Sequence, residues 1–189
     1  MSIELRTAST AETHEVAAAI AGLARAGDVI VLAGEMGAGK TAFAQGFGRA
    51  LGVDGPITSP TFTLVHSYDI ESGPHAGKIT LHHADLYRLD HTAEVAELAL
   101  PELAEFRGIV LVEWGDVVDG MFGDHLVVYL ETAYDDALDL DAGDAGDAGD
   151  DDLDVLSLEG RRIIEIAGVG ASWAGRWERL SDAVEGYRC

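Results

Sequence analysis

The stretch GEMGAGKT at residues 34–41 is the feature that most constrains how this chain can fold. It fits the pattern G-x-x-x-x-G-K-[ST], in which glycines let successive backbone N–H groups turn inward around an anion. The run DVIVLAG before it is apolar enough for a strand buried on both faces, and TAFAQGFGRALG after it resembles a helix. This order predicts a loop that holds phosphate at a helix N-terminus, and the alternative is a glycine-rich turn without a ligand.

The two residues that end the pattern have the chemistry of a nucleotide site. Lys40 would bridge the β- and γ-phosphates, and Thr41 would offer its hydroxyl to Mg²⁺. Because the loop grips only phosphates, it reveals neither the base nor the reaction. The predicted nucleotide-binding residues of the loop are Gly34, Glu35, Met36, Gly37, Ala38, Gly39, Lys40, Thr41 and Ala42.

Two carboxylates near the ends of predicted strands complete a candidate phosphoryl-transfer site. Glu113 ends the apolar run IVLVE and is predicted to hold Mg²⁺ in the Walker-B role, the alternative being a merely solvent-exposed carboxylate. Asp85 in HHADLYR is predicted to hold the metal through water or to orient the attacking water, the alternative being a cap on a turn. His83 shares a strand face with Asp85, but a zinc site there would lack its third and fourth ligands.

The segment TSPTFT at residues 58–63 is polar, β-prone and broken by Pro60. Small hydroxyl residues beside a nucleotide can become ordered when the γ-phosphate is present, which makes Thr61 a candidate switch residue. An ordinary strand entrance is the alternative interpretation.

Alternating strand and helix patterns along the whole chain predict an α/β fold, a mixed β-sheet with flanking helices. A first helix is expected over residues 9–26, with a capping box at Ser9 and Glu12 and a stop at Gly27. We expect residues 1–189 to form one domain. Other strands are predicted within 57–70, 79–87, 108–116 and 124–131 and on both sides of the Glu159–Gly160 turn, and other helices over 92–105, interrupted near Pro101, and 172–184.

Residues 135–154 stand apart, with ten Asp, no basic residue and a repeated D-A-G unit. We interpret them as a solvated, disordered insertion between two strands, because so acidic a segment cannot bury a core. A cation-binding loop is the alternative, although EF-hand spacing with a terminal Glu is missing.

Composition limits the possible partners and the compartment. The chain has 12 basic and 34 acidic residues and a formal charge of -22, which argues against it holding nucleic acid by itself. Cys189 is its only cysteine, so no internal disulfide can form. The start MSIELRTAS lacks the basic and apolar regions of a signal peptide. We therefore expect a cytoplasmic protein that does not contact a membrane.

Four motifs follow one another along the chain: GEMGAGKT, SPTFTLV, HADLYRL and VEWGD. Over about residues 7–131 they resemble the TsaE (YjeE) family, the bacterial ATPases of tRNA N6-threonylcarbamoyladenosine biosynthesis. The resemblance implies a three-layer, P-loop NTPase-like fold that binds ATP and Mg²⁺ and hydrolyses ATP. We expect hydrolysis to be slow without partners, because no residue is an obvious strong general base for water. It also implies TsaB and TsaD as partners, TsaD transferring threonylcarbamoyl to adenosine 37, so that tRNA is contacted only indirectly.

The resemblance also implies roles for single residues at matching motif positions. Lys40 and Thr41 lie in the nucleotide loop, Glu113 ligates Mg²⁺, and Asp85 supports the metal or the attacking water. The resemblance also implies roles for Thr61 in the switch-like segment and for Trp114 at a strand end implicated in activity. It further implies a residue near the adenine within residues 7–10, which we assign to Thr10. After Glu131 the chain departs from the family pattern.

Three other functions are alternatives. A small-molecule kinase usually carries several arginines over its phosphates, whereas only Arg49, Arg88 and Arg107 lie between the loop and Glu131. A GTP switch would need a guanine-reading N-K-x-D stretch, which the sequence lacks. A non-hydrolysing module that binds ATP and docks to a partner differs only in whether hydrolysis occurs.

Overall fold

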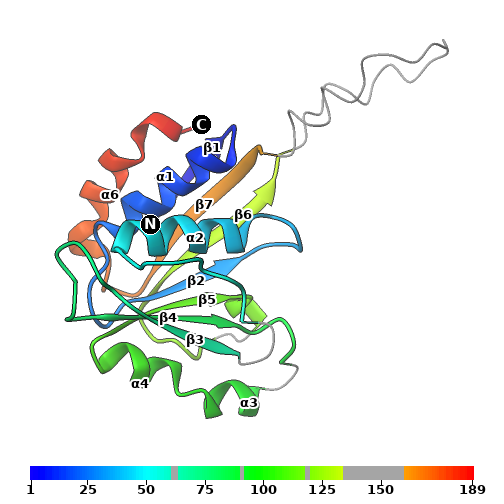
Figure 1. Cartoon of the computed structure of the whole chain (residues 1–189). Helices are drawn as coiled ribbons and strands as arrows, with labels where there is room; N and C mark the ends of the chain where they lie inside the picture. The colour runs from blue at the N-terminus through cyan, green and yellow to red at the C-terminus, as the bar shows by residue number, and fades with distance from the viewer. Residues whose placement is uncertain (61–63, 90–91, 118–119, 134–159) are drawn as a thin grey trace, which may run out of the picture.

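The computed structural model describes residues 1–60, 64–89, 92–117, 120–133 and 160–189, which build a seven-stranded sheet (Figure 1). The strand order is β1-β7-β6-β2-β5-β4-β3. Four neighbouring strands are parallel, and the outer strands pair antiparallel, which confirms the predicted mixed α/β sheet. The parallel strands are β6 (His125–Thr132), β2 (Val29–Ala33), β5 (Gly108–Glu113) and β4 (Thr80–Asp85), and the others are β1 (Ser2–Thr7), β7 (Arg162–Val169) and β3 (Val65–Asp69).

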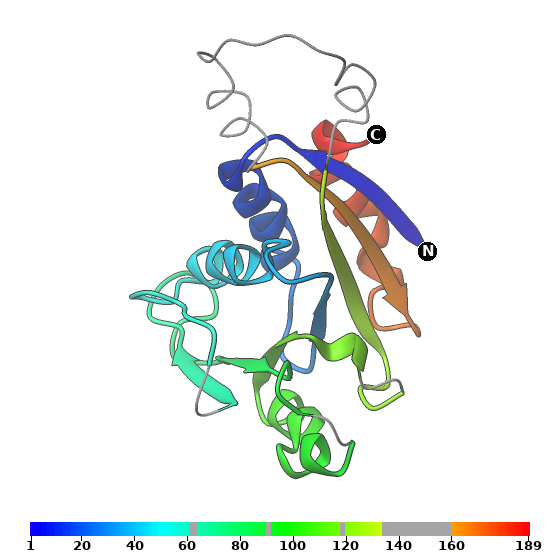
Figure 2. The ribbon, with the colours of Figure 1, turned by 90° about the vertical axis from the view of Figure 1, so that its right-hand side faces the viewer.

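Helices cover both faces of this sheet and make three layers (Figures 1 and 2). Alternate residues of β2 supply the two cores: Ile30 and Leu32 pack on one side, Val29 and Val31 on the other. One face carries α1 (Thr10–Ala21), α2 (Lys40–Leu51) and α6 (Trp177–Ala183), and the other carries α3 (Thr92–Glu97) and α4 (Leu100–Glu105). Short 3-10 turns lie at Gly115–Val117, Ala174–Arg176 and Glu185–Tyr187. Among the described residues, none of the helices has the length and apolar character to cross a bilayer.

Helix α1 begins as predicted but ends earlier. The Ser9 side chain accepts a hydrogen bond from the Glu12 amide at 3.2 Å, as the capping-box pattern implies. The predicted stop at Gly27 is wrong, because the helix ends at Ala21. The Asp28 carboxylate accepts the Arg25 amide at 2.7 Å, and the Gly27 amide donates to the Gly108 carbonyl at 2.9 Å. These contacts turn residues 25–28 into β2 instead of continuing the helix.

Strand β1 is an element that the sequence patterns above do not predict. Its residues alternate between exposed and buried, with Ile3, Leu5 and Thr7 facing inward. It pairs antiparallel with β7, from Ser2 opposite Ala167 to Thr7 opposite Arg162. A six-residue strand of this kind is stabilised by a partner far along the chain, and short sequence windows do not contain that partner.

The remaining predicted elements are matched in part. The helical stretch 92–105 is divided into α3 and α4, and Pro101 lies in the first turn of α4, where its missing N–H is tolerated. Residues 172–184 form a 3-10 turn followed by α6, whose Leu180 is fully buried in the core. Thr61, the insertion at 135–154 and the strand predicted before Gly160 lie outside the described residues.

Candidate functional site

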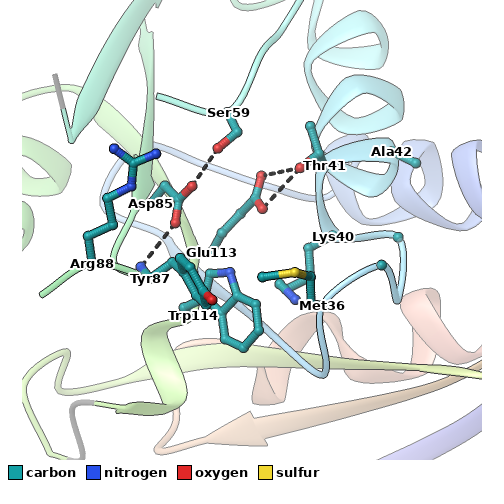
Figure 3. Close-up of a pocket in the computed structure, with 12 residues that line it drawn as sticks. Met36, Lys40, Thr41, Ala42, Ser59, Asp85, Tyr87, Arg88, Glu113 and Trp114 are labelled. Atoms are coloured by element: carbon teal, nitrogen blue, oxygen red, sulfur yellow. Dashed lines mark hydrogen bonds between the residues drawn. The ribbon is translucent and has the colours of Figure 1, made fainter. Parts of the chain in front are cut away.

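The glycine-rich loop lies between β2 and α2, and its backbone needs glycine at both ends. Gly34 has φ 123°, and a Cβ there would lie 2.0 Å from the Leu130 carbonyl oxygen of β6. Gly39 caps α2 with φ 104°, a left-handed conformation that side chains disfavour. The loop is therefore held against the sheet with the N-terminus of α2 facing the pocket in Figure 3.

Strand order brings the predicted carboxylates to this loop. β5 lies beside β2 with Leu32 opposite Glu113, and β4 lies beside β5 with Asp85 opposite Glu113. Because all three strands are parallel, their carboxyl ends meet at one edge of the sheet. The two predicted carboxylates, Asp85 and Glu113, are thus brought together by backbone pairing.

Glu113 and Thr41 are in direct contact. The Thr41 hydroxyl is 3.0 Å from Oε1 and 3.1 Å from Oε2 of the Glu113 carboxylate (Figure 3). Glu113 is only 3% exposed, so it is not the solvent-facing carboxylate of the alternative interpretation. A hydroxyl beside a carboxylate is the kind of hard oxygen pair that Mg²⁺ prefers, with substrate phosphates and water completing its shell. These two residues fit that ion.

Lys40 is buried against its own loop. Its ammonium donates to the carbonyl oxygens of Gly34 and Glu35, both at 2.7 Å, and lies 3.6 Å from the centre of the Trp114 ring. Burial lowers the pKa of Lys40, while the nearby carboxylates of Glu113, Asp116 and Asp85 oppose that shift. Trp114 follows the end of β5 at φ 62°, and its ring packs against Tyr87 with 4.9 Å between ring centres.

Asp85 has polar contacts on both carboxylate oxygens. Ser59 donates its hydroxyl to Oδ2, and the Tyr87 amide donates to Oδ1 at 3.0 Å (Figure 3). The second contact is the turn cap of the alternative interpretation, and the first joins Asp85 to the segment that precedes Thr61. Ser59 was not singled out by the sequence, although it belongs to the same polar segment.

The predicted site residues do not all line the pocket, whose volume is about 330 Å³. Thr10 starts α1 and is exposed, and it is not part of the wall. Gly34, Glu35 and Ala38 belong to the loop without lining the cavity. Tyr87 and Arg88 line it although neither was predicted. The predicted residues in the wall are Met36, Gly37, Gly39, Lys40, Thr41, Ala42, Asp85, Glu113 and Trp114.

Arg162 is a further contact of the loop that the sequence did not suggest. At the start of β7, its Nε donates to the Ala38 carbonyl at 2.8 Å, and one terminal nitrogen lies 3.5 Å from the Gly37 carbonyl. A charged donor to these two carbonyls stabilises the loop conformation, and the loop amides do not take part in these bonds and are left for an anion. More than a hundred residues separate the partners, and no local pattern marks Arg162.

Comparisons with known proteins agree with one another. The family model described as threonylcarbamoyl adenosine biosynthesis protein TsaE matches residues 7–138. The tRNA threonylcarbamoyladenosine biosynthesis protein TsaE of Bacillus subtilis is 35% identical over 135 residues, 71% of this chain and 80% of that protein. Its namesake in Streptomyces coelicolor is 35% identical over 128 residues, 67% of this chain and 83% of that protein. A crystal structure of Bacillus subtilis YdiB is similar with TM-score 0.67 and 28% identity, over 96% of this chain and 95% of that one.

Proposed function

The chain belongs to the TsaE family of threonylcarbamoyladenosine biosynthesis proteins, and on this premise we propose that it is a Mg²⁺-dependent ATPase. Its hydrolysis of ATP would support the formation of N6-threonylcarbamoyladenosine at position 37 of tRNA. The observation that carries the proposal is the contact between Thr41 and Glu113 in one pocket with Lys40. A phosphate loop, a hydroxyl and a strand-end carboxylate are the parts that phosphoryl transfer needs.

In this proposal the backbone of residues 34–41 and the Lys40 ammonium bind the ATP phosphates. On binding, the Lys40 ammonium would give up its hydrogen bonds to the Gly34 and Glu35 carbonyls and donate to phosphate oxygens instead. Its backbone would stay at the N-terminus of α2. Bound Mg²⁺ would neutralise developing charge on the phosphates, and Thr41 and Glu113 would hold it. Loop amides and the buried Lys40 ammonium act on the phosphates from positions fixed by the fold, so they need little reorganisation when charge develops.

Asp85 is the candidate for orienting the attacking water. Both of its oxygens are held, by Ser59 and by the Tyr87 amide, so the carboxylate has a defined direction at the pocket wall. The Asp85–Ser59 contact supports a link between this water and the segment that contains Thr61. We propose that Thr61 senses the γ-phosphate through this segment.

The proposed partners are the TsaB and TsaD proteins, with tRNA bound by the assembly and not by this chain. The formal charge of -22 supports this division, because binding of nucleic acid depends mainly on Lys and Arg. A cytoplasmic location follows from the same proposal, because the tRNA substrate is there.

The test is release of phosphate from Mg-ATP by the purified chain, with and without a TsaB–TsaD pair from the same organism. We expect slow hydrolysis by the chain alone and faster hydrolysis with the pair. Phosphate transfer to a small acceptor in place of water would favour the kinase alternative. Tight ATP binding without hydrolysis in either condition would reject the enzyme and leave an ATP-gated docking module.

Arg162→Met tests whether β7 supports the phosphate loop. Arg162→Met removes a charged donor to two loop carbonyls and is expected to weaken ATP binding by about tenfold or more. A hydrogen bond to a charged group contributes about 1.5–3 kcal/mol, and about 1.4 kcal/mol is tenfold in affinity. Calorimetric titration with ATP measures the change. Arg6→Met, on the exposed side of the neighbouring strand β1, is the matched control. Unchanged affinity in folded Arg162→Met would contradict the supporting role.

A further inference from the structure

His83 is a buried histidine whose ring reaches the candidate metal ligand. It lies in β4 with no exposed surface, and its Nε2 is 2.9 Å from Oε1 of Glu113. Pairing of β4 with β5 puts Asp85 opposite Glu113, so His83 approaches Glu113 diagonally from two residues earlier. None of the roles proposed above uses this contact.

The contact determines which ring nitrogen carries the proton. A carboxylate oxygen is only an acceptor, so Nε2 must be the donor. The other nitrogen, Nδ1, is buried and has no hydrogen-bond partner among the described residues. The ring therefore makes one polar contact within this part of the chain, and that contact is directed at Glu113.

Two described side chains donate to the Glu113 carboxylate, Thr41 and His83. They differ in what happens when the metal binds. Thr41 would become a ligand together with Glu113, so its hydrogen bond would give way to coordination. His83 would be the donor that remains and would keep the carboxylate from rotating. Hydrogen bonds of this kind to a ligating group commonly change metal affinity by about 10- to 100-fold.

We propose that His83 is a positioning residue that orients Glu113 for Mg²⁺ through Nε2–H. The proposal rests on the proposed function, since it assumes that Glu113 holds the metal. Its signature is specific: loss of His83 weakens the part of ATP binding that depends on Mg²⁺ and leaves the metal-free part unchanged. A purely structural role would weaken both parts or lower only the unfolding temperature.

Three substitutions of His83 test whether a hydrogen-bond donor is needed at the place of Nε2. The amide nitrogen of His83→Gln can occupy the place of Nε2 and donate to Glu113. The shorter side chain of His83→Asn extends only as far as the place of Nδ1, and His83→Leu has no donor. The control is His82→Leu, because His82 is also buried but faces the other side, where Ser67 lies 2.9 Å from its Nδ1.

The measurement is ATP affinity in MgCl₂ and in EDTA for each variant, by calorimetry on folded protein. The ratio of the two affinities compares each variant with itself. A general loss of folded protein therefore affects both affinities alike and cancels in the ratio. We expect His83→Asn and His83→Leu to lower this ratio by about 10- to 100-fold. If the wild-type ratio is smaller than that, both variants should lower it to a value of one, which means no effect of Mg²⁺ on ATP affinity. His83→Gln and His82→Leu should keep it.

Three results would overturn the proposal, and they differ in what they leave of the proposed function. An unchanged ratio in His83→Leu, with a clear Mg²⁺ effect in the wild type, would remove the role of His83 and leave the ATPase proposal intact. Equal weakening in MgCl₂ and EDTA would have the same consequence. ATP binding by the wild type that ignores Mg²⁺ would instead reject the proposed function, and the role of His83 with it.

Discussion

Glu113→Ala is expected to lower Mg²⁺-dependent ATP hydrolysis by about 100-fold or more while the chain stays folded. The substitution removes the carboxylate proposed to hold the metal. A metal that stabilises charge in the transition state contributes several kcal/mol to catalysis. Because about 1.36 kcal/mol corresponds to a tenfold change in rate, losing that contribution lowers the rate by about 100-fold or more. Initial rates of phosphate release, with the TsaB–TsaD pair present, measure the change. ATP binding in EDTA should be nearly unaffected.

Glu113→Gln separates the charge from the hydrogen bonds. Alanine leaves the buried donor of His83 and the half-buried donor of Thr41 without their acceptor, and the loss at His83 costs about 1–3 kcal/mol of stability. Glutamine retains one oxygen that can accept. Both variants should lose hydrolysis, and the alanine variant should unfold at lower urea concentration. Glu131→Ala removes an exposed carboxylate from the neighbouring end of β6 and is the control. Normal hydrolysis by Glu113→Gln would exclude the metal-binding role.

Arg176→Met is expected to destabilise the fold by about 3–5 kcal/mol, because it leaves the Asp28 carboxylate buried without its partner. Arg176 is 4% exposed and Asp28 6%, and the two are joined by hydrogen bonds of 2.6 and 2.8 Å. The guanidinium also donates to the carbonyls of Leu23 and Ser172 and lies 4.0 Å from the Trp173 ring centre. It thereby ties the C-terminal segment to the entrance of β2.

Urea unfolding followed by circular dichroism measures this effect. Arg179→Met, an exposed arginine in α6, is the control and should change stability little. The double variant Arg176→Met with Asp28→Leu removes the unpaired charge, so its loss should be smaller than the sum of the two single losses. It should still be destabilised, because the Leu23 and Ser172 carbonyls and the Arg25 amide lose their partners. A loss below about 1 kcal/mol in Arg176→Met would show that the buried pair adds little.

The glycine-rich loop between a buried strand and a helix could be predicted because all of its parts are consecutive. Left-handed backbone at Gly34 and Gly39 requires glycine, and the lysine and hydroxyl follow in the next two positions. The place of Glu113 at the end of a buried strand could be predicted because an apolar run that ends in a carboxylate is recognisable in one short window. The motif order also led to the correct family, which the comparisons established independently.

Other parts of the site have no local pattern. Arg162 reaches Ala38 from a strand that the sequence alone could not place beside the loop. His83 was considered only for zinc with Asp85, since its contact with Glu113 depends on the pairing of β4 with β5. Strand β1 was missed because its partner is β7, at the other end of the chain.

By itself, the sequence determined the glycine-rich loop, the buried strands and the helix that follows the loop, because glycine conformation and apolar runs act between near neighbours. Only the tertiary structure decided which strands lie side by side, and so which carboxylate, histidine and arginine reach the loop. Strand order depends on pairing the backbone hydrogen bonds of every strand and covering both faces of the sheet at once. That balance involves residues from Ser2 to Val184, and no short segment contains it.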